Sequence, residues 1–175
     1  MRDAPTSQLD LDGDIWRFAL RLYGAPGCSD ACLRLQDEAG IDVVNMIIVL
    51  YADAKLNRRL SGDQVNLLKA EMKRWRDETV LPLRRLRRRL KAPPAAFPAE
   101  ETEALRNLIK KAELRSEQIQ LAMGERWLSR TMPADGLTVE TALLMLCEEM
   151  PDVPPANIRV LIEELATAAR RGPPL

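Results

Sequence analysis

The fold of this chain is decided by the stretch Val43-Val44-Asn45-Met46-Ile47-Ile48-Val49-Leu50-Tyr51-Ala52. Only Asn45 in it is strongly polar, and Asp42 directly before it is a suitable helix cap. The run is too long for an ordinary strand and contains no turn residues, so the pattern predicts a helix over 43–56. A helix that is apolar on every side must be buried on most of them. We therefore expect this helix at the centre of the fold, with Asn45 in hydrogen bonds that hold the structure together.

The overall composition also favours packed helices. Hydrophobic residues make up 46% of the 175 residues and aromatic residues only 4%, and Leu, Ala, Ile, Val and Met suit helix packing here better than a sheet. The length is sufficient for one globular core. No apolar run is long enough for a membrane span, and the N-terminus lacks the hydrophobic block of an export signal. We therefore expect a cytoplasmic protein without a membrane span.

Further helices are predicted on both sides of the central one. Apolar spacing and turn residues place them over about 14–23, 26–39, 64–91, 99–130, 138–149 and 155–170. Pro82 lies inside the helix over 64–91, where it should cause a kink near Thr79–Leu81. The connector Ala92–Pro98 is rich in proline and cannot continue a helix. The two long helices on either side of it are therefore expected to form a hairpin.

An apolar row at steps of three and four is predicted to form the seam of this hairpin: Val65, Leu68, Met72, Trp75, Thr79, Leu83, Leu86 and Leu90. Leu83, Leu86 and Leu90 follow one another at steps of three and four, which places them on one face of the first helix. The residues of the second helix that would face this row are Leu105, Leu108, Ala112, Ile119 and Ala122. The predicted fold is therefore an all-α, single-domain bundle of about seven helices with a long, kinked helical hairpin.

The predicted helices also define the domain organisation. We expect a flexible arm over residues 1–13 and a helical core domain over 14–131 that includes the hairpin. A C-terminal helix pair over 132–171 should pack on the core, and residues 172–175 should be frayed.

Charge is distributed unevenly along the chain, although 26 basic and 26 acidic residues cancel. Residues 54–91 contain thirteen bases and four acids, whereas residues 1–53 contain nine acids and four bases. Within the basic segment, residues 84–91 read Arg-Arg-Leu-Arg-Arg-Arg-Leu-Lys. Arginine favours two-point contact with carboxylate or phosphate. We predict contacts with a partner through the cations Arg84, Arg85, Arg88, Arg89 and Lys91.

Several roles for this basic helix remain open. The leading hypothesis is a non-enzymatic adaptor or regulatory protein that binds an acidic partner protein. The second is nucleic-acid or ribosome-associated binding by the same cations, although aromatic residues for base stacking are scarce nearby. The alternative without a partner is a solvated face that pairs in part with Glu100, Glu101 and Glu103. The oligomeric state stays open.

Catalytic and metal chemistry have little support in the sequence. The chain contains no histidine, which removes the commonest general base and most zinc sites, and it has no glycine-rich phosphate loop. Asp37, Glu38 and Asp42 are close in sequence, so a carboxylate-based enzyme is the third hypothesis. Cys28 and Cys32 lie four residues apart, and packing in a reduced protein explains them better than a metal site. We predict no cofactor.

Several short motifs are similar to one known family. They are Ile15–Tyr23, Pro26-Gly27, Ala31–Asp37, Gly40–Asn45, Trp75-Arg76, Pro82–Arg84, Arg87–Lys91 and Lys111–Leu114. Over about residues 14–120 the chain resembles small proteobacterial proteins of unknown function. The resemblance implies a bacterial, soluble, all-helical protein and carries no activity or catalytic residue. The chain departs from the family pattern at Tyr51-Ala52-Asp53, which argues against a family-wide role for Asp53.

Overall fold

The computed structural model describes residues 8–148 and 154–171. The elements are α1 (Asp14–Gly24), α2 (Cys28–Ala39), α3 (Val43–Leu56), α4 (Gly62–Trp75), the π-helical segment η1 (Arg76–Val80), α5 (Leu81–Arg89), α6 (Ala99–Arg130), α7 (Val139–Leu146) and α8 (Ala156–Arg170). No strand occurs in these two ranges, and the predicted all-α bundle is confirmed. The helix predicted over 64–91 is divided by η1 into α4 and α5. The predicted tail over 172–175 and residues 1–7 of the predicted arm lie outside the described residues.

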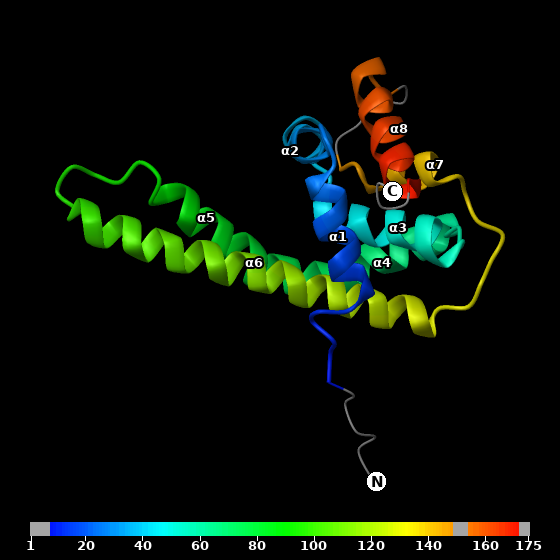
Figure 1. The fold of residues 1–175 in the computed structure, drawn as a ribbon, viewed down its shortest axis with the longest axis horizontal. Coiled ribbons are helices and arrows are strands. Elements are labelled where there is room, and N and C mark those ends of the chain that lie inside the picture. The colour runs from blue at the N-terminus through cyan, green and yellow to red at the C-terminus, as the bar shows by residue number, and fades with distance from the viewer. Residues whose placement is uncertain (1–7, 149–153, 172–175) are drawn as a thin grey trace, which may run out of the picture.

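The helices form a head and a protruding hairpin (Figure 1). Helices α1 to α4, α7 and α8 gather in the head, while α5 and the N-terminal part of α6 extend away from it. Helix α6 is 32 residues long, and its C-terminal part returns along α1, α3 and α4. We call residues 81–117 the hairpin arm. The head and the arm therefore share α6 as a common support.

Helix α3 is the centre of the head, as predicted. Every residue from Val43 to Ala52 is buried, and α3 contacts α1, α2, α4, α6, α7 and α8. Asp42 caps the helix, since its side chain accepts a hydrogen bond of 3.0 Å from the backbone N–H of Val44. Asn45 is also buried, but its Oδ1 has no hydrogen-bond partner among the described residues. The expected hydrogen bonding is therefore wrong for this oxygen.

Helices α3 and α6 approach each other closely at Gly124. A Cβ atom at this position would overlap Cδ1 of Ile48 and lie 2.6 Å from its Cγ1. Ile48 is completely buried and has little room to move. Glycine is required here by the contact between the helices.

Pro82 is accommodated without a break in the helix. The segment η1 precedes it, and the N–H of Leu81 donates to the carbonyl oxygen of Arg76, five residues earlier. Proline has no N–H to donate and crowds the preceding turn of an α-helix, whereas a π-helical turn has one more residue. The expected kink near Thr79–Leu81 therefore takes the form of a π-helical turn over Arg76–Val80.

Leucines do not form the seam of the hairpin arm. No residue of α5 is buried. Leu86, Leu105 and Leu108 are 44%, 49% and 63% exposed. The predicted seam is buried at Val65, Leu68 and Met72 of α4. It is wrong for the leucines of α5, because α5 turns a different face, with Arg84 and Arg87, toward α6.

The C-terminal helices complete the head. Helix α7 packs against α3 and α4, and α8 packs against α2, α3 and α7. Helix α7 ends at Leu146, earlier than predicted, because Cys147 is extended. None of the helices in the described ranges combines the length and the hydropathy that a bilayer span requires.

The variant Gly124→Ala should lower the free energy of unfolding by about 2 kcal/mol, because the added methyl group overpacks a rigid contact. Chemical denaturation measures the loss. Gly24→Ala is the matched control: a Cβ there meets nothing within 4 Å, so its effect should stay within about 0.5 kcal/mol. Ile48→Val removes the overlapping Cδ1, so the double variant should lose less than the sum of the single losses. Equal effects of the two glycine substitutions would contradict the close approach.

Candidate partner-binding surface

The cations of the basic helix fall into two sets. Arg84 and Arg87 face α6, and their side chains are only 19% and 26% exposed. The other set, Arg85, Arg88, Arg89 and Lys91, is exposed. Residues three apart share a helix face, which explains why Arg84 and Arg87 turn inward together.

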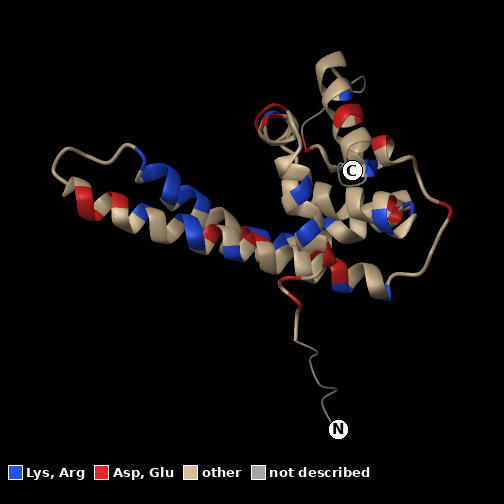
Figure 2. Cartoon of the chain, in the orientation of Figure 1, with Lys and Arg blue, Asp and Glu red and all other residues tan. Residues whose placement is uncertain are grey.

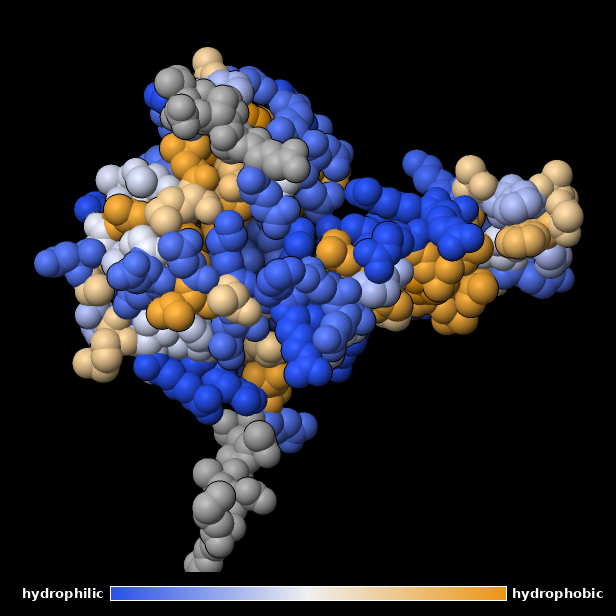
Figure 3. All heavy atoms as spheres, turned by 180° about the vertical axis from the view of Figure 1, so that it is seen from behind, coloured by the Kyte–Doolittle hydropathy of each residue, from blue (hydrophilic) through white to orange (hydrophobic). Residues whose placement is uncertain are grey.

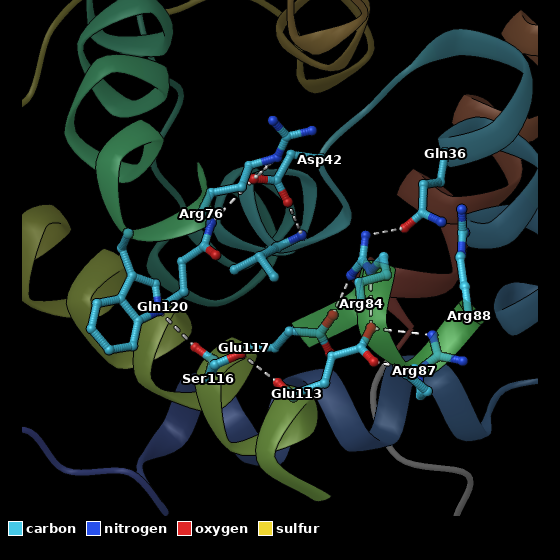
Figure 4. A network of polar contacts seen from close by, with 12 residues as sticks. Gln36, Asp42, Arg76, Arg84, Arg87, Arg88, Glu113, Ser116, Glu117 and Gln120 are labelled. Carbon is cyan, nitrogen blue, oxygen red and sulfur yellow. Dashed lines mark hydrogen bonds and ion pairs between the residues drawn. The ribbon is translucent and has the colours of Figure 1, made fainter. Parts of the chain in front are cut away.

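The inward set forms a network of ion pairs at the base of the arm (Figure 4). The Nε of Arg84 donates to Glu113 at 2.9 Å, and its Nη2 pairs with Glu117. The Nη1 of Arg84 donates to the side chain of Gln36 on α2 at 2.9 Å. Arg87 also pairs with Glu113 and donates from Nη2 at 3.2 Å. Arg84 therefore joins α5 both to α6 and to the head.

The two carboxyl groups of this network differ in their pKa values. Burial favours the neutral form of Glu113, but hydrogen bonds from Arg87 and Arg84 outweigh burial and lower the pKa of Glu113 below its ordinary value. Burial dominates at Glu117 and raises its pKa despite the nearby Arg84. Glu117 therefore takes up a proton at a higher pH than Glu113.

These contacts correct one predicted site residue. Arg84 was expected to contact a partner, but its guanidinium group is bound by the chain's own Glu113, Glu117 and Gln36. The expected pairing of the basic helix with Glu100, Glu101 and Glu103 is also not observed among the described ion pairs. The antiparallel hairpin instead brings α5 next to a later part of α6.

The exposed cations of the basic helix form only weak ion pairs with the described residues. Arg88 has an exposed contact of 4.0 Å with Asp37. Within the part of the chain that the structure describes, no carboxylate oxygen lies within 4.0 Å of the charged nitrogens of Arg85, Arg89 or Lys91. Figure 2 shows the resulting concentration of basic residues along α5.

Exposed leucines lie beside these cations. Leu86 is exposed on α5, with the half-buried Leu83 and Leu90 three residues before it and four after it. Leu105 and Leu108 are exposed on one face of α6 at a spacing of three. Figure 3 shows a hydrophobic area on the arm directly beside a hydrophilic band. We define the arm surface by these exposed residues of α5, of the turn after it and of α6: Arg85, Leu86, Arg88, Arg89, Lys91, Leu105, Leu108, Lys110 and Lys111.

The three carboxylates proposed for an enzyme do not share a site. Asp37 is exposed and lies near α5. Glu38 accepts hydrogen bonds from Arg34 at 2.9 Å and Asn157 at 2.8 Å. Asp42 caps α3 and lines a cavity that includes neither Asp37 nor Glu38. Each carboxylate therefore has its own local surroundings.

The cysteine pair has the character of packed, unreactive thiols. Cys28 and Cys32 are free and buried. Burial raises the pKa of Cys32 to about 12 and also raises that of Cys28, so both sulfur atoms stay protonated at neutral pH. In the described ranges, no group of three or more Cys, Asp or Glu side chains is placed to hold a metal ion.

Comparison with known proteins gives a family. A sequence model described as "Protein of unknown function (DUF2390)" matches residues 14–123. The chain belongs to the DUF2390 family. The DUF2390 match includes α3 and the whole hairpin arm but neither α7 nor α8. No curated protein and no solved structure matches the chain.

Sequence reasoning missed several residues of this region. Arg87, Glu113 and Glu117 were not singled out, although a signal for them was present. Two arginines three apart on one helix, and two glutamates four apart on its hairpin partner, indicate opposite charges on facing sides. The prediction missed it because it assigned leucines, and not these charged residues, to the contact between the two helices.

The variant Glu113→Gln should lower the free energy of unfolding by about 3 kcal/mol, because it leaves two partly buried guanidinium groups without their shared carboxylate. Urea denaturation at neutral pH measures the loss. Glu103→Gln is the control: Glu103 pairs with Arg106 on the exposed side of the same helix, so its loss should stay within about 1 kcal/mol. Similar losses in both variants would refute the special role of Glu113.

The difference between wild type and Glu113→Gln should also depend on pH. The pKa of Glu113 in the folded protein lies below the ordinary value of 4.5. Its stabilising contribution is therefore complete above the unfolded pKa and disappears as the pH falls through the lower folded value. The two proteins should approach equal stability in acid. A difference that stays constant from neutral pH into strong acid would contradict this assignment.

Proposed function

We propose that this protein is a non-enzymatic adaptor or regulatory protein whose hairpin arm binds an acidic partner protein. One observation carries the proposal: the arm extends from the head and presents exposed cations beside exposed leucines, and among the described residues only Arg88 of these cations has an ion pair, at 4.0 Å. The partner segment that fits this surface has an apolar stripe flanked by carboxylates, as an acidic amphipathic helix has.

The arrangement of charge supports an acidic partner. Arg85 and Arg89 are four apart on α5, and Arg85 and Arg88 are three apart, so like charges are neighbours on the helix surface. Each such pair destabilises a helix by roughly 0.2–0.5 kcal/mol. Arg84 and Arg87 already bind Glu113, so the outward cations are not needed to close the hairpin. Carboxylates of a partner would relieve their repulsion.

The exposed leucines favour a protein over a nucleic acid. Leu86, Leu105 and Leu108 lie beside the cations and remain largely exposed. Burial of such side chains against a partner gains roughly 25 cal/mol per Å² of apolar surface, and a third helix laid along the arm would bury them. Phosphate groups would contact the cations alone. The nucleic-acid alternative therefore leaves the apolar part of the surface unexplained.

The proposal includes a bacterial, cytoplasmic setting. Cys28, Cys32 and Cys147 are free thiols. Free thiols are typical of a reducing compartment.

Charge reversal on the arm should abolish partner binding. In the triple variant Arg85→Glu, Arg88→Glu and Arg89→Glu, affinity for the partner should fall about 100-fold, because attraction to carboxylates becomes repulsion. The control reverses three exposed cations away from the arm: Lys55, Arg59 and Arg130. It changes the net charge equally and should alter affinity by less than about threefold.

The measurement has two stages. Complexes are purified from the native host with and without nuclease, and the partner is then produced alone and titrated against wild type and variants by calorimetry. The proposal requires a direct complex that survives nuclease, involves an acidic segment of the partner and also weakens in Leu105→Ser with Leu108→Ser. Retention of RNA or DNA alone would overturn it in favour of the second hypothesis. A complex formed only by two copies of this chain would also overturn it.

A further inference from the structure

A polar cleft lies in the head, apart from the arm surface. It has a volume of about 330 Å³ and lies between the start of α3, one face of α4 and the end of α7. Asn66, Lys69 and Lys73 come from α4, where steps of three and four place them on one face. The volume is at the lower end of the range for small-molecule sites, roughly 300–1,000 Å³.

Asn45 gives this cleft an unsatisfied polar group. Asn45 lines the cleft and is only 5% exposed. Its Oδ1 is buried and has no hydrogen-bond partner among the residues described. Buried polar atoms are normally paired, and an exception requires an explanation such as a missing ligand. A ligand N–H or O–H group that reached this oxygen from the cleft would provide the missing donor.

Lys69 gives the cleft an uncommitted positive charge. Its Nζ makes one weak contact, 3.4 Å from the carbonyl oxygen of Met145, and no carboxylate of the described residues forms an ion pair with it. Lys73, one turn further along α4, pairs with Asp77 at an exposed position. Such exposed pairs contribute little and exchange readily, so Lys73 is available to a ligand. Two ammonium groups therefore flank the cleft.

The remaining charges at the cleft are already paired. Arg76 lies 3.2 Å from Asp42 and 3.8 Å from Glu148. Asp42 also accepts hydrogen bonds from the backbone of Val44 and from Gln120. Arg76 and these two carboxylates together leave one negative charge, so with Lys69 and Lys73 the cleft lining is positive by one, and the positive charge lies on the α4 side.

We propose that this cleft binds a small phosphorylated molecule that carries an N–H or O–H donor close to its phosphate group, of the size of a sugar phosphate. The phosphate would bind Lys69 and Lys73, since a dianion matches two ammonium groups better than a carboxylate does. The adjacent donor would bind Oδ1 of Asn45, and the amide of Asn66 would contact the polar remainder. This inference is independent of the proposed role of the arm.

The test uses ribose 5-phosphate as the probe and the full-length protein. Isothermal titration and thermal unfolding are measured at constant ionic strength, with sulfate as the simple anion and gluconate as the hydroxylated carboxylate. Ribose 5-phosphate should bind saturably and raise the melting temperature. It should bind at least about tenfold more tightly than sulfate or gluconate, because only it offers both the dianion and the donor.

The variants locate the site. Lys69→Gln and Asn45→Leu should each weaken ribose 5-phosphate binding about tenfold, because each removes one ligand contact. Lys69 is at the surface, so its replacement keeps the protein folded, and circular dichroism confirms this for both variants. Lys110→Gln on the arm removes the same charge elsewhere and should have no effect. The proposal is overturned by absence of saturable binding, by equal binding of sulfate or gluconate, or by unchanged binding in Lys69→Gln.

Discussion

Enclosure of α3 is the constraint on which the rest of the structure depends. A helix with apolar side chains on every side must be surrounded by other helices, and α3 contacts six of them. The enclosure of α3 also constrains the sequence of α6. Position 124 of α6 is glycine, because a side chain there would overlap Ile48 of α3. The long α6 is thereby fixed along the head, and its N-terminal part can project as one side of the arm.

The arm is held together by a different interaction. Its two helices have no third helix to cover their leucines, so the partly buried pairs of Arg84 and Arg87 with Glu113 close the hairpin instead. Partly buried ion pairs of this kind fix geometry more than they add net stability. Arg84 also reaches Gln36 on α2. This contact connects the arm to the head. The leucine face of the arm stays uncovered.

Sequence reasoning predicted the features that depend on local pattern. The helix over Val43–Leu56, its Asp42 cap and the disturbance before Pro82 follow from hydrophobicity, capping chemistry and the missing proline N–H. The register between the two arm helices depends on tertiary contacts, so the leucine seam and an outward Arg84 were wrong. The unpaired Oδ1 of Asn45 could not be predicted either, because a sequence pattern indicates that a residue is buried but not where its hydrogen-bond partners lie.

The base of the hairpin arm and the polar cleft of the head both depend on contacts made by two short segments, η1 and residues 113–120 of α6. Arg76 in η1 pairs with Asp42 at the start of α3. Helix α5 begins directly after η1. On α6, Glu113 and Glu117 bind Arg84, while Gln120, one turn later, donates to Asp42 (Figure 4). The extra residue of the π-helical turn therefore sets the rotation of α5 relative to α4 and Arg76. A regular α-helical turn there would rotate Arg84 away from Glu113, because removing one residue turns everything beyond it by roughly 100°.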